Sequence, residues 1–159
     1  MDVKAVEQEL NSFTPGAFGD QQLGSNLVHQ KVQVVQAGYD FAVQGGAVST
    51  INLYDPLLGT ASTVVIPSGA IIKQVLINVI TPCTTSASGT MNLTAQSAAD
   101  LKAALAAASW TGLVAGIPVG TAATMIKMTA DRTLTTAIAT GAITAGKFDV
   151  IVEFYSPVT

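Results

Sequence analysis

The chain has 159 residues, which is enough for one domain with one hydrophobic core. Hydrophobic residues make up 49% of it but charged residues only 11%, and the formal net charge is -3. The seven basic residues are spread singly, so the sequence lacks the basic cluster that nucleic-acid binding requires. Because Cys83 is the only cysteine, an internal disulfide and multi-cysteine metal sites are excluded. So little charge is typical of a surface that partners cover.

Residues 1–30 differ from the rest of the chain and predict an extended N-terminal arm. Three acidic residues occur in the first nine positions, and a segment punctuated by Pro15, Gly16 and Gly19 follows. Neither helical nor strand periodicity is sustained. We interpret four irregularly spaced apolar residues as separate anchors on a partner: Phe13, Phe18, Leu23 and Leu27. The alternative that the sequence leaves open is a solvated tail.

From residue 31 onward the pattern predicts short β-strands separated by Gly, Pro and Thr turns. The clearest strand ends the chain, where Phe148, Val150, Val152 and Phe154 alternate with mostly polar residues. Ile71–Ile80 is apolar on both faces, which favours a central strand or one whose outer face meets another subunit. The predicted strands cover about residues 31–36, 48–54, 63–66, 71–80, 90–96, 125–129, 134–140 and 147–155.

One segment changes to a helical pattern. Ser97 with Asp100 resembles a capping box ahead of Leu101, Ala104 and Leu105, and this predicts a short helix at about residues 98–108. Residues 103–126 carry no charge and are long enough to span a bilayer, but glycine and proline interrupt them, so we expect no membrane partner. The prediction is an all-β domain over residues 31–159, an antiparallel β-sandwich or jelly roll with this one helix.

The sequence offers little for catalysis. The only histidine, His29, lies in the arm, where a catalytic triad would have no rigid scaffold. We therefore predict a protein that is not an enzyme and that binds no metal or cofactor. Trp110 is either a platform for stacking sugars or a plug between helix and sheet, and the second interpretation is favoured.

Several segments of the C-terminal two-thirds form a recognisable series: Val65–Ile72, Val79–Pro82, Asp100-Leu101 with the Ala-rich segment after it, Thr129–Leu134 and Thr144–Phe154. Over about residues 60–156 the chain resembles small virion proteins of tailed bacteriophages, particularly capsid decoration (cement) proteins. The resemblance implies a trimeric subunit on the outer surface of a capsid, bound to the major capsid protein where capsomers meet. It carries no functional side chains to transfer.

Self-association is also expected from the residues themselves. A neutral surface with an apolar outer side, at Ile71–Ile80 and at Ile151, favours closed symmetry, and we predict a homotrimer. The alternative function is a receptor- or glycan-binding module of a tail or fibre, in which Trp110 or Tyr54 would stack on sugars. The sequence does not decide between a head and a tail location.

Overall fold

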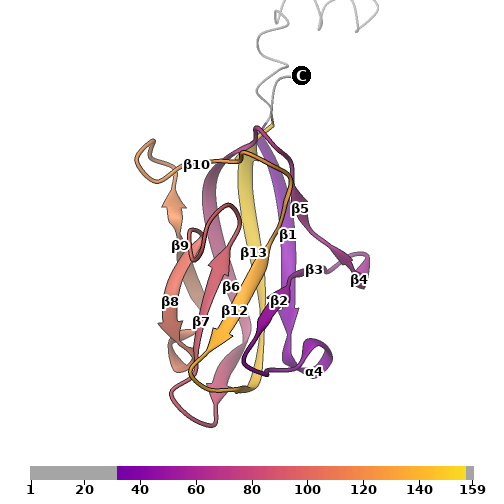
Figure 1. Cartoon of the computed structure of the whole chain (residues 1–159), viewed down its shortest axis with the longest axis vertical. Coiled ribbons are helices and arrows are strands. Elements are labelled where there is room, and N and C mark those ends of the chain that lie inside the picture. Colours follow the sequence, from indigo (N-terminus) through magenta and orange to yellow (C-terminus); the bar gives the residue numbers. More distant parts are fainter. Residues whose placement is uncertain (1–31, 157–159) are drawn as a thin grey trace, which may run out of the picture.

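The structure, a computed structural model, describes residues 32–156. It is an antiparallel β-sandwich in which a smaller sheet packs face to face against a larger one (Figure 1). The predicted all-β class is therefore confirmed. The predicted arm, its four anchors and His29 lie outside the described residues.

Three long strands form the centre of the larger sheet: β6 (Ile71–Thr85), β13 (Ile143–Tyr155) and β1 (Val32–Asp40). The order is β10-β6-β13-β1-β3-β4, and β9 also pairs with β6. The short strands of this sheet are β3 (Tyr54–Asp55), β4 (Gly59–Thr63), β9 (Leu113–Val119) and β10 (Ile126–Lys127). The predicted alternation of the last strand is present in β13, where every second residue from Phe148 to Phe154 lies in the core.

The smaller sheet has the order β2-β12-β7-β8. Its strands are β2 (Thr50–Asn52), β12 (Thr135–Ala139), β7 (Thr90–Thr94) and β8 (Lys102–Ala106). A separate pair, β5 (Val65–Ile66) with β11 (Arg132–Thr133), joins the two layers at one side.

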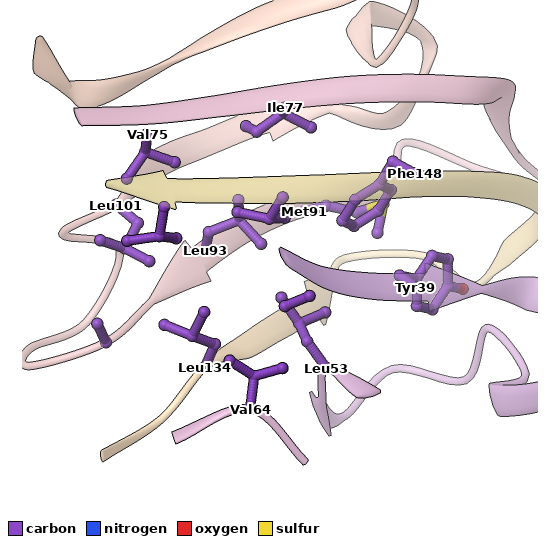
Figure 2. Packing of buried hydrophobic residues seen from close by; sticks show 14 of the residues in the cluster. Tyr39, Leu53, Val64, Val75, Ile77, Met91, Leu93, Leu101, Leu134 and Phe148 are labelled. Atoms are coloured by element: carbon purple, nitrogen blue, oxygen red, sulfur yellow. The ribbon is translucent and has the colours of Figure 1, made fainter. Parts of the chain in front are cut away.

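The core fills the space between the two sheets (Figure 2). Val75, Ile77 and Phe148 project from the larger sheet toward Met91 and Leu93 of the smaller one. Phe148 is the centre of an aromatic stack, with ring centroids 5.1 Å from Tyr39 and 4.9 Å from Trp110. Trp110 is fully buried, as a plug would be, but it packs against Phe148 of the sheet and not under a helix, because no α-helix forms at residues 98–108.

The predicted helix at residues 98–108 is wrong. This segment forms the edge strand β8 and a 3₁₀ turn, η1 (Ala107–Ser109). The α-helix of the described residues is α4 (Phe41–Gln44), capped by the Asp40 side chain, which accepts a hydrogen bond from the Ala42 N–H at 2.9 Å. A helix of eleven residues depends on packing for its stability, and the alanines offer little surface to bury. Pairing with β7 satisfies the backbone of the segment instead.

Asp100 begins no helix but closes the loop between β7 and β8. Its carboxylate accepts three backbone hydrogen bonds, from the N–H groups of Ala95, Gln96 and Ser97, each at 2.8 Å. The capping-box pattern therefore correctly predicts that Asp100 accepts from the Ser97 N–H, but the turn that Asp100 holds is a hairpin loop.

The charge-free segment 103–126 contributes β9, which the sequence reading missed. Gly116 allows β9 to pass close to β6, since a β-carbon there would overlap the side chain of Val75. Within residues 32–156, no helix has the length and hydrophobicity needed to cross a membrane.

Candidate interaction surface

The reactive side chains of the described residues are dispersed or buried. Residues 32–156 contain no cluster of three or more His, Cys, Asp or Glu side chains that could hold a metal ion. Burial raises the pKa of the Cys83 thiol to about 11, so this thiol is neutral at physiological pH and unsuited to nucleophilic chemistry. Trp110 and Tyr54, the two candidates for sugar stacking, are 0% and 8% exposed, so neither presents a ring face to a ligand.

The two buried ionisable groups predict a loss of stability at alkaline pH. Burial raises the pKa of Tyr39 to about 12, and its hydroxyl donates to the Gly45 carbonyl at 2.8 Å. Both Tyr39 and Cys83 ionise more readily in the unfolded chain than in the folded one. Their contribution to the free energy of unfolding is therefore complete below pH 9 and is lost as the pH rises from about 9 to 12. Each group accounts for about 2–3 kcal/mol of this loss in the free energy of unfolding. Urea unfolding between pH 8 and 11.5 should show this decline.

The Cys83→Ala variant provides the control for this measurement. In this variant, the free energy of unfolding should still fall where Tyr39 ionises. The part of the fall that begins near pH 9 should be absent. A free energy of unfolding that stays constant up to pH 11.5 would contradict the assignment.

Exposed apolar side chains gather at the two edges of the larger sheet. At the β9 edge they are Ile80, Leu113, Ile117 and Val119, which are 40–70% exposed. At the opposite edge, Val34, Leu57, Leu58 and Val65 are 48–92% exposed. Single exposed apolar residues are ordinary, but contiguous groups of them mark interaction surfaces.

A groove follows the second of these edges. It has a volume of about 380 Å³ and lies between β1, the β3–β4 turn and the start of β5. Its lining residues are Val34, Val35, Gln36, Asp55, Leu57, Leu58, Ser62, Thr63, Val64 and Val65. Figure 1 shows the β3–β4 hairpin standing out beside β1. We call this feature the β1 groove.

The outer face of the larger sheet is mixed in character. Lys147 and Asp40 form an ion pair at 3.0 Å, and this hydrogen bond holds the pKa of Asp40 below its usual range. Lys73 and Glu153 form a second pair at 3.2 Å. Leu76 and Ile151 lie opposite one another in the register and are half-buried. Paired charges beside apolar residues leave this face close to neutral.

The fold defines the class of the protein as an antiparallel β-sandwich without a recognisable catalytic centre in residues 32–156. Neither a protein-family model nor a curated protein matches the sequence. Solved structures do match. One is the "Acidic stable capsid structure of Helicobacter pylori bacteriophage KHP30", with a TM-score of 0.56 and 12% identity over 81% of this chain and 90% of that one.

A second match is the "Cyanophage Pam1 capsid asymmetric unit", with a TM-score of 0.55 and 20% identity. The aligned region covers 81% of this chain and 87% of that chain. At such low identity the shared property is the fold. The chain therefore has the fold of chains found in two phage capsid structures, over nearly their whole length.

Proposed function

We propose that this protein is a non-enzymatic structural protein of a bacteriophage virion, and more specifically a decoration (cement) protein. In this role it binds the major capsid protein on the outer capsid surface, where capsomers meet, and stabilises the shell. The observation that carries the proposal is the match of fold to chains of two phage capsid structures, at 81% coverage of this chain.

The surface of the molecule supports an assembly role. Apolar groups at both edges of the larger sheet can be buried against partners, and each 100 Å² of apolar area buried is worth about 2.5 kcal/mol before the costs of association. Copies that join several neighbours act multivalently, so modest contacts add up over a shell. The neutral outer face lowers the desolvation cost of such contacts, because few unpaired charges have to be buried.

We propose that each copy associates first with two other copies of the same chain, in a homotrimer. Three copies related by cyclic symmetry can pair the two different apolar edges head to tail and close the ring. Light scattering of the purified protein at micromolar concentration should report three times the mass of the 16.2 kDa chain. A monomer under these conditions would count against a trimer that forms before the shell is reached.

Location on the particle tests the proposal against its alternative. Phage particles that contain the protein are labelled with gold-coupled antibodies raised against the folded domain and imaged by negative-stain microscopy. A decoration protein should place gold over the outer surface of the head. Gold confined to the tail or its fibres would favour the receptor-binding alternative. In that case the sugar would have to stack on residues other than Trp110 and Tyr54, which are buried. Gold on neither structure would contradict both functions.

A further inference from the structure

We draw no further inference here: the strongest candidate, the edge of β1 along the β1 groove with the exposed Leu57 and Leu58 beside it, carries nothing because no contact within residues 32–156 shows what covers this edge.

Discussion

Phe148→Ala should lower the free energy of unfolding by about 3–5 kcal/mol, the range found for large aromatic side chains removed from cores. Phe148 is fully buried at the centre of the sandwich, and its ring contacts those of Tyr39 and Trp110. Alanine would remove the buried area of the ring and leave a cavity between two large aromatic side chains that cannot collapse to fill it. Urea or thermal unfolding followed by tryptophan fluorescence measures this directly, because Trp110 reports on the same cluster.

Leu113→Ala is the control for this prediction. Leu113 is 70% exposed, so its truncation should change the free energy of unfolding by less than about 0.5 kcal/mol. Equal losses in the two variants would mean that the aromatic cluster is not the centre of the core.

Asp100→Ala should lower the free energy of unfolding by about 3 kcal/mol or more, because it leaves three backbone N–H groups of the β7–β8 loop without their acceptor. Asp100→Asn should cost less, since one amide oxygen can still accept from part of this set. The loop also connects the two layers, because the Gln96 side chain exchanges hydrogen bonds with Thr129 at 2.7 and 3.1 Å. Amide hydrogen exchange in residues 95–101 should therefore accelerate in Asp100→Ala even under native conditions.

Asp131→Ala is matched to this change. Asp131 is exposed and accepts one backbone hydrogen bond, from Ser68 at 2.7 Å. Its loss should cost about 1 kcal/mol. A cost for Asp100→Ala no larger than that for Asp131→Ala would show that the three short hydrogen bonds do not act together.

The candidate surface could be predicted only in part. Low charge and the apolar outer position of Ile151 indicated a surface that meets other subunits, and the described face is indeed nearly neutral. The β1 groove had no signal in the sequence. Leu57 and Leu58 follow Asp55-Pro56 in an ordinary turn, and nothing in that pattern shows that the turn lies beside β1 and lines a groove with it.

The sequence by itself determined the β class and the long strands. In β13 the strict alternation from Phe148 to Phe154 leaves one register that buries the apolar face, so the local pattern and the fold agree. Tertiary structure alone decided the segment after Asp100 and the course of β9. Alanine has a high helix propensity, but a short helix there would bury little, whereas pairing with β7 satisfies the backbone and closes the smaller sheet. Because strand partners lie far apart in the sequence, such pairing energy is absent from any local pattern.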